Sequence, residues 1–235
     1  MRRETARLAA AVVAFAVAMA YVEAAVVVDL LAALDVGASV LPLERGAEAD
    51  RLIAIEVGRE LATLVMLGAV GWIAGTTRLE RLAWAAVAFG TWDILYYAWL
   101  RVMIDWPASL DTLDILFLVP LPWTGPVWAP VAVSIALVGF GLAAAARLRR
   151  GDGLPISRSE VLSGLAGGLL VMLSFMLEAG DVLAGSLPDF PWWWFVLGMA
   201  LAVGAAVRAL RRPGRGPGGP GGPIAPIASI ASITS

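Results

Sequence analysis

The sequence predicts an all-α, polytopic membrane protein with six transmembrane helices. Of its 235 residues, 60% are hydrophobic and only 15% are charged, whereas a soluble domain carries about a quarter charged residues. Six apolar stretches are each about long enough to cross the roughly 30 Å hydrocarbon core of a bilayer as a helix. Arginine is concentrated in alternate loops between these stretches. Apolar side chains in such excess need lipid rather than water as their solvent.

The six expected spans form one transmembrane domain, residues 1–212. Their expected ranges are 6–30, 52–75, 82–104, 127–146, 161–183 and 192–210. The first span follows several arginines, as a signal peptide would, but it is longer than a typical signal sequence and lacks a clear cleavage site. We therefore expect a retained helix. Residues 213–235 are rich in Pro, Gly and small residues, so this tail is expected to be disordered.

Arginine placement predicts that both termini face the cytoplasm. Thirteen of the 17 basic residues, all of which are arginine, lie at the N-terminus, in the second-to-third and fourth-to-fifth loops, or at the end of the last span. The opposite loops hold only Arg45 and Arg51, and residues 105–126 contain no basic residue. The positive-inside rule places the arginine-rich side in the cytoplasm. We therefore expect a protein of the inner or plasma membrane. The arginine content of every loop agrees with both termini in the cytoplasm, which requires an even number of spans.

Residues 111–123 form an apolar stretch that is too short to span a bilayer. Pro120 and Pro122 prevent a regular helix through its end. Trp106, Trp123 and Trp128 flank or end the stretch, and tryptophan rings favour the membrane interface. We expect an interfacial or re-entrant segment on the outer face.

Several kinds of chemistry are excluded by missing residue types. The chain has no cysteine and no histidine, and it also lacks lysine. Disulfides, thiolate catalysis, Cys- or His-bearing zinc sites, the usual haem ligand and a retinal Schiff base are therefore excluded. No cofactor is evident, although a divalent cation stays open. The net charge of −2 gives no indication of nucleic-acid binding.

Ionisable residues within the expected spans are the candidate functional residues, because such groups are costly inside a bilayer. Most are carboxylates in the outer halves of four spans, so we expect them to share one site. The candidates are Glu23, Glu56, Arg59, Glu60, Asp93, Tyr96, Tyr97, Arg101, Glu178 and Asp181. Glu56 and Glu60 share a helix face at four-residue spacing, as do Asp93, Tyr97 and Arg101.

Three interpretations of this acidic site are open. It binds or transports a cation or a proton, since carboxylates bind hard cations through oxygen and also exchange protons. Alternatively, it is the site of an intramembrane enzyme that acts on a lipid or lipid-linked substrate, with carboxylates as acid and base. In the third interpretation, Arg59 and Arg101 pair with the carboxylates in a structural network of a homo-oligomer or membrane complex. The candidate metal ligands are Glu56, Glu60, Asp93 and Glu178.

Four segments together carry a resemblance to a known family. They are residues 21–28 (YVEAAVVV), 56–67 (EVGRELATLVML), 92–100 (WDILYYAWL) and 122–130 (PWTGPVWAP). The combination resembles a family of uncharacterised polytopic membrane proteins from bacteria and archaea. The resemblance covers residues 17–130 and, less closely, the last two spans. It implies a membrane fold of about six spans and no particular activity.

Overall fold

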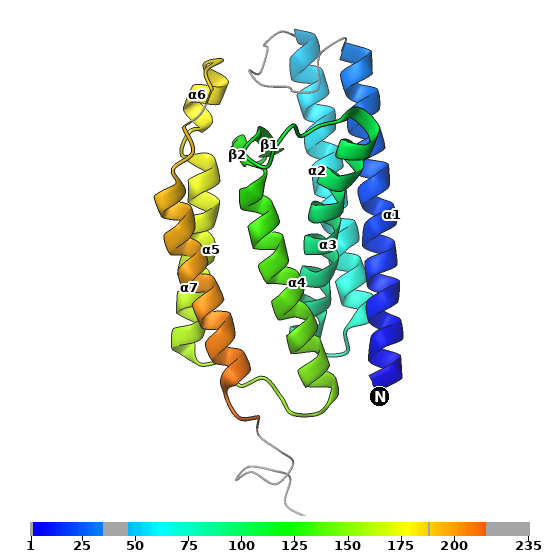
Figure 1. Cartoon of the computed structure of the whole chain (residues 1–235), viewed down its shortest axis with the longest axis vertical. Helices are drawn as coiled ribbons and strands as arrows, with labels where there is room; N and C mark the ends of the chain where they lie inside the picture. Colours follow the sequence, from blue (N-terminus) through cyan, green and yellow to red (C-terminus); the bar gives the residue numbers. More distant parts are fainter. Residues whose placement is uncertain (1, 35–46, 188, 215–235) are drawn as a thin grey trace, which may run out of the picture.

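The computed structural model of the chain describes residues 2–34, 47–187 and 189–214, which form a bundle of long helices with a small hairpin near one end (Figure 1). The helices are α1 (Arg2–Leu34), α2 (Ala47–Ala74), α3 (Arg78–Ile104), α4 (Trp128–Arg149), α5 (Arg158–Met176), α6 (Ala179–Leu183) and α7 (Trp192–Arg211). The strands β1 (Leu113–Phe117) and β2 (Trp123–Pro126) pair antiparallel. The N-terminus and the end of α7 lie opposite the hairpin (Figure 1). The expected disordered tail lies, from residue 215 on, outside the described residues.

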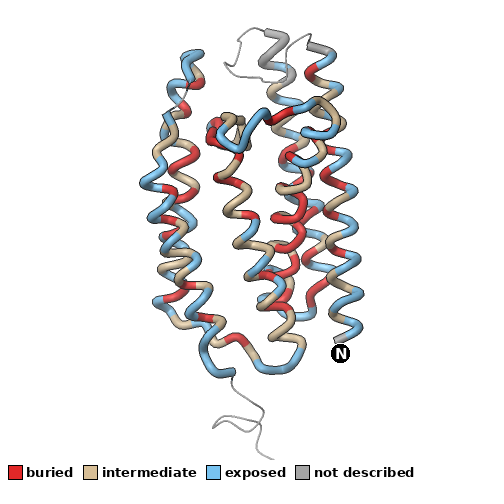
Figure 2. The backbone as a smooth tube through the Cα atoms, in the orientation of Figure 1, coloured by how far each residue is buried: buried red, intermediate tan, exposed pale blue. Residues whose placement is uncertain are grey.

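The prediction of a mostly helical membrane protein is confirmed. Within the described ranges, four segments are long and apolar enough to cross a membrane: Arg3–Ala32, Trp128–Arg149, Arg158–Leu183 and Trp192–Arg211. Large apolar side chains are also strongly exposed, including Val65 at 71%, Ile73 at 82% and Trp193 at 69%. Buried residues concentrate on the inward-facing sides of the helices (Figure 2). An apolar exterior of this extent is solvated by lipid rather than by water.

Helix α3 lies at the centre of the larger group of helices and packs against α1, α2 and α4, while α5 packs mainly against α7. Small residues such as Ala20, Ala88 and Ala145 occupy the buried interior beside Trp84, which is 1% exposed. Small side chains let helix backbones approach closely and gain dispersion contacts, which drive helix association in a membrane. This packing fixes the faces that α1, α2 and α3 present to one another.

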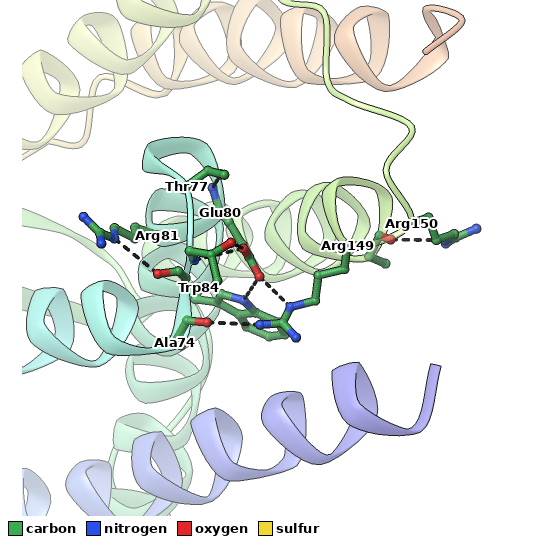
Figure 3. Close-up of polar contacts among 10 residues, drawn as sticks. Ala74, Thr77, Glu80, Arg81, Trp84, Arg149 and Arg150 are labelled. Carbon is green, nitrogen blue, oxygen red and sulfur yellow. Dashed lines mark hydrogen bonds and ion pairs between the residues drawn. The ribbon is translucent and has the colours of Figure 1, made fainter. Parts of the chain in front are cut away.

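An ion pair between Glu80 and Arg149 joins the start of α3 to the end of α4 (Figure 3), at the end of the bundle opposite the hairpin (Figure 1). Thr77 caps α3, because its side-chain oxygen accepts a 3.2 Å hydrogen bond from the Glu80 backbone N–H. The Glu80 carboxylate accepts hydrogen bonds from Arg149 Nε at 2.5 Å, from Thr76 and from Trp84. Burial acts to raise the pKa of Glu80, but these bonds outweigh it and lower that pKa to about 2. The cluster holds the α2–α3 turn against α4.

The fifth expected span is interrupted in the structure. Residues 161–183 were expected as one helix, but α5 ends at Met176 and the short α6 begins at Ala179. Between them, Glu178 has φ −95° and ψ 12°, outside the helical region. Gly180 and Asp181, which follow this break, have weak helix propensity and disfavour a continuous helix here. The other five expected spans each coincide with one long helix.

The expectation of a purely helical chain misses the β1–β2 hairpin, which lies where an interfacial or re-entrant segment was expected. Pro120 and Pro122 in the connection prevent a helix. Backbone N–H and C=O groups still need partners when little water is present. Antiparallel pairing of the two strands supplies partners, and just beyond them the Val127 N–H donates to the Thr112 carbonyl oxygen at 3.0 Å. The hairpin also covers the carboxylates described next.

Candidate functional site

Helices α2 and α3 and strand β1 enclose a small polar cavity, which we call the acidic cavity. Its volume is about 60 Å³. Its lining residues are Glu56, Arg59, Glu60, Thr63, Trp92, Asp93, Tyr96, Tyr97, Asp114, Ile115, Leu116 and Phe117. Six of the ten residues proposed from the sequence therefore line one cavity, and Glu23 adjoins it through Arg59 and Thr63.

Arg59 links two carboxylates from different helices. Its guanidinium forms an ion pair with Glu23 of α1 and a two-pronged contact with Glu56, including a 2.9 Å bond from Nε. Thr63, one turn further along α2, donates a 2.6 Å hydrogen bond to Glu23. Glu23 is only 5% exposed, so removal of Arg59 would leave a buried charge without its partner. Arg59 thereby ties α1 to α2 at the edge of the cavity.

Glu60 binds the hairpin directly. The backbone N–H of Leu118, the residue after β1, donates to both carboxylate oxygens at 3.0 Å. Glu60 is 7% exposed. Since Glu56 and Glu60 lie on one face of α2, the helix contributes one carboxylate to Arg59 and the next to the hairpin. The hairpin is thus attached to the cavity that it covers.

Asp93 is a buried carboxylate with a neutral hydrogen-bond partner. It is 8% exposed, and it accepts a 2.8 Å hydrogen bond from the hydroxyl of Ser134 on α4. Gly90, three residues earlier, allows this contact: a Cβ there would lie 2.6 Å from the Ser134 carbonyl oxygen. Close approach of α3 and α4 therefore sets the position of Asp93. Ser134 had not been expected from the sequence as part of the site.

Asp114 of β1 is a further acidic member that the sequence-based expectation missed. It accepts a 3.0 Å hydrogen bond from the Tyr97 hydroxyl. Burial raises the pKa of Asp114 to about 7, although hydrogen bonds from Tyr97 and the Ile115 backbone oppose the rise. A lone carboxylate within the apolar run 113–118 was the available signal. Asp114 lies outside the expected spans, between residues 104 and 127, whereas the expected site residues all lie within them.

Aromatic side chains form one wall of the cavity. Tyr96 stacks with Trp92 at a centroid separation of 6.2 Å and meets Tyr97 edge-on at 5.3 Å. The Trp92 indole N–H is buried and has no hydrogen-bond partner within the described residues. Buried donors are normally satisfied by protein or water. This N–H can therefore donate to a polar species in the cavity.

The remaining three candidates lie elsewhere. Arg101 turns away to the backbone carbonyls of Asp105 at 2.5 Å and Pro107 at 3.3 Å, and its side chain is 54% exposed. Glu178 precedes α6 and Asp181 is an exposed residue within it. Neither lines the cavity, so the expected sharing of one site by four spans is wrong for the fifth span. Asp93 and Tyr97 line the cavity, as their four-residue spacing predicts. Arg101 has the same spacing but lies in the last turn of α3, beyond the cavity.

Charge in and beside the cavity is strongly unbalanced. Five carboxyl groups meet there, from Glu23, Glu56, Glu60, Asp93 and Asp114, and among the described residues Arg59 is the single arginine that lines it. Exclusion of Arg101 makes the excess larger than the sequence indicated. Several adjacent buried carboxylates cannot all stay ionised without a compensating cation. The arrangement can therefore hold protons or a cation.

The carboxylates do not converge as a metal cage. Across the described part of the chain, no group of three or more acidic residues is arranged to hold a metal ion. Glu56 and Glu60 each bind a different protein donor, and Asp93 binds Ser134. A divalent cation would need to displace some of these bonds. No family model matches this chain, and no curated protein or solved structure matches it either.

Proposed function

We propose that this chain is a six-span protein of the inner or plasma membrane whose acidic cavity binds a proton or a small cation. The observation that carries the proposal is the excess of carboxyl groups over arginine around a buried space of about 60 Å³. Water occupies roughly 30 Å³ per molecule in the liquid. The cavity therefore suits a proton, a few waters or a bare ion.

A membrane orientation with both termini in the cytoplasm supports an extracytoplasmic site. The N-terminus and the end of α7 lie at one end of the bundle and the hairpin at the other (Figure 1). Six long helices, α1 to α5 and α7, run between these two ends. The arginine-rich loops between α2 and α3 and between α4 and α5 lie at the same end of the bundle as the two termini. The positive-inside rule assigns that end to the cytoplasm.

A proton is favoured over a divalent metal because the carboxylates are held by separate donors. Asp93 has a neutral hydroxyl partner and very little exposure, and a carboxylate in such surroundings is stabilised by protonation. Ca²⁺ would take six to eight oxygen ligands, which the present arrangement does not offer. Lipid chemistry is not favoured, because small-molecule sites commonly measure several hundred Å³.

Infrared difference spectroscopy on the purified full chain tests this proposal. As the pH is raised, the C=O band of protonated carboxyl groups should disappear. Asp93→Asn or Asp114→Asn should remove part of this band, whereas Glu178→Gln, a carboxyl outside the cavity, should leave that part unchanged. Spectra of both cavity variants identical to those of the unaltered protein would reject proton binding.

Thermal stability in detergent tests whether the acidic cavity binds a cation other than a proton. Sodium, magnesium, calcium and manganese salts are compared at constant ionic strength, since a ligand that binds only the folded state raises its stability. A cation-specific rise lost in Glu56→Gln and Asp93→Asn, but kept in Glu178→Gln, would identify the ion. Flux of that ion or of protons into vesicles that contain the protein would then show transport.

A structural role is the second candidate, because the cavity's bonds tie α1, α2, α3, α4 and the hairpin together. Glu60 and Asp114 both hold the hairpin, and Arg59 joins two helices. In this case Asp93→Asn and Glu60→Gln lower stability without changing the carboxyl band or the cation response. The same two measurements therefore separate binding from a purely structural network.

A further inference from the structure

A second pocket, larger than the acidic cavity and more open to the surface, lies at the opposite end of the bundle, between the C-terminal ends of α4 and α7. Its volume is about 550 Å³. Four arginines line it: Arg147 and Arg150 from α4, and Arg211 and Arg212 from α7. We call it the basic cavity. None of these residues belongs to the acidic cavity.

Arg147 fixes the walls of the basic cavity. It donates to the carbonyl oxygens of Gly153 at 2.8 Å and Leu210 at 2.5 Å, and also to that of Arg212. These bonds fasten the loop after α4 and the end of α7 to one guanidinium. Carbonyl groups orient the guanidinium but do not neutralise its charge. The cavity is therefore a preformed site with a positive wall.

Positive charge in this cavity exceeds negative charge. Among the described residues, Asp152 is the one acidic residue of the lining, and Glu160 forms a 2.9 Å ion pair with Arg212. In the described part of the chain, Arg147, Arg150 and Arg211 have no carboxylate partner among the ion pairs. Arg150 is exposed and bonds to the Ala146 carbonyl at 3.1 Å, and Arg211 is exposed as well. Both can turn toward an anion.

We propose that the basic cavity binds the phosphate group of an anionic membrane lipid. The guanidinium group matches phosphate oxygens in pairs, which favours arginine at such sites. The cavity lies at the ends of two helices that are apolar enough to cross a membrane, where lipid head groups are found. Basic pockets between transmembrane helices bind acidic head groups by the same physics.

The lining also favours a lipid over free phosphate. Ala143 and Leu210 add an apolar part to the lining, which the glycerol and the first acyl carbons of a lipid can contact. Free phosphate would use only the arginines. A volume of about 550 Å³ exceeds what a phosphate ion needs and suits a head group with its glycerol. The proposal depends on membrane embedding and not on the function of the acidic cavity.

Native mass spectrometry of the detergent-purified full chain tests the proposal. Equal amounts of phosphatidylglycerol and phosphatidylcholine are added, since both carry a phosphate diester but only the first is anionic. We expect retention of phosphatidylglycerol over phosphatidylcholine. Arg150→Gln combined with Arg211→Gln should lower that preference by roughly fivefold or more, given the usual contribution of a basic residue near a lipid surface.

The matched control removes two exposed arginines at the same end of the bundle but outside the cavity, Arg7→Gln with Arg78→Gln. Its lipid preference should stay unchanged. Both double variants avoid Arg147, so their melting temperatures in neutral detergent should match that of the unaltered protein. Arg150→Lys combined with Arg211→Lys provides a second test, because it keeps both charges but loses the paired geometry of the guanidinium, and it should also weaken the preference.

Three results would overturn the proposal. One is equal retention of the two lipids by the unaltered protein. Another is an equal loss of preference in the control pair, which would indicate general attraction to the arginine-rich end. The third is complete displacement of phosphatidylglycerol by millimolar inorganic phosphate, which would assign the cavity to free phosphate instead.

Discussion

The hydroxyl of Tyr97 on α3 donates a 3.0 Å hydrogen bond to the carboxylate of Asp114 on β1. This bond joins the helical bundle to the hairpin from inside the cavity that the hairpin covers. Glu60 makes the second attachment, through the Leu118 backbone N–H. Both attachments end on a carboxyl group, so the cover of the acidic cavity depends on the same groups that give the cavity its charge.

Tyr97→Phe should lower the free energy of unfolding by about 1–2 kcal/mol, because a buried acceptor loses its donor. Thermal denaturation in detergent measures the loss. Tyr21→Phe is the matched control, since Tyr21 is 49% exposed, and it should change stability little. Equal effects of the two substitutions would show that the Tyr97–Asp114 bond does not hold the hairpin.

Asp114 should make stability fall as the pH rises from about 4 to 7. Its pKa is about 7 in the folded protein, against 3.8 for an ordinary aspartate. The folded state therefore keeps a proton that the unfolded state has lost in this window. The slope approaches about 1.4 kcal/mol per pH unit and vanishes above the folded pKa.

The measurement is the difference in unfolding free energy between the unaltered protein and Asp114→Asn across this pH range. The difference should decline with pH and then become constant, because the asparagine does not titrate. A difference that rises with pH would mean that Asp114 is stabilised as a carboxylate, contrary to its buried surroundings.

Arg59→Gln should cost about 3–5 kcal/mol, since it leaves Glu23 buried without its cationic partner. Glu23→Gln introduced together with Arg59→Gln should restore much of this loss, because the uncompensated charge is then absent. A double-mutant cycle by denaturation in mixed micelles measures the coupling. Arg101→Gln removes an arginine outside the cavity and should change stability by less than about 0.5 kcal/mol.

Glu80→Gln should destabilise the protein by about 2–4 kcal/mol, because it breaks the ion pair of the buried Glu80 carboxylate with Arg149. Glu80 has a folded pKa of about 2, below its ordinary value of 4.5. Its contribution is therefore fully present above pH 4.5 and is lost as the pH falls toward 2. Asp111→Asn, at an exposed carboxylate, should show neither effect. If Glu80→Gln lost as much stability between pH 4.5 and 2 as the unaltered protein does, Glu80 would not be the group that titrates in this range.

Gly90→Ala should push α3 away from α4, because its Cβ would lie 2.6 Å from the Ser134 carbonyl oxygen. The cost is expected at about 1–3 kcal/mol from overpacking. Gly139→Ala on α4 is the control, since nothing lies within 4 Å of a Cβ at that position. The control should be neutral or stabilising, as alanine favours helix. Melting temperatures in detergent distinguish the two.

The sequence alone predicted much of the acidic cavity, because helix periodicity is a local property. Glu56 and Glu60 at four-residue spacing had to share a face of α2, and both line the cavity. Asp93 and Tyr97 on α3 line it for the same reason. Arg101 follows the same spacing, yet the end of α3 leaves it beside the carbonyls of Asp105 and Pro107. Helix periodicity predicts which residues share one face of a helix. It does not predict how far along that face the neighbouring elements extend, and so which of those residues they cover.

Composition and the length of the apolar segments were enough to predict that this chain is mostly helical and embedded in a membrane. Solvation by lipid depends on the amount of apolar side chain, and that amount is known directly from the sequence. Tertiary structure decided which polar groups meet. The Leu118 backbone N–H that binds Glu60 exists at nearly every residue and has no distinguishing signal in the sequence. Ser134 reaches Asp93 only because Gly90 lets two backbones come close, and Asp114 enters the cavity only because prolines turn its segment into a hairpin. Contacts between distant segments depend on packing, and packing is a property of the whole fold.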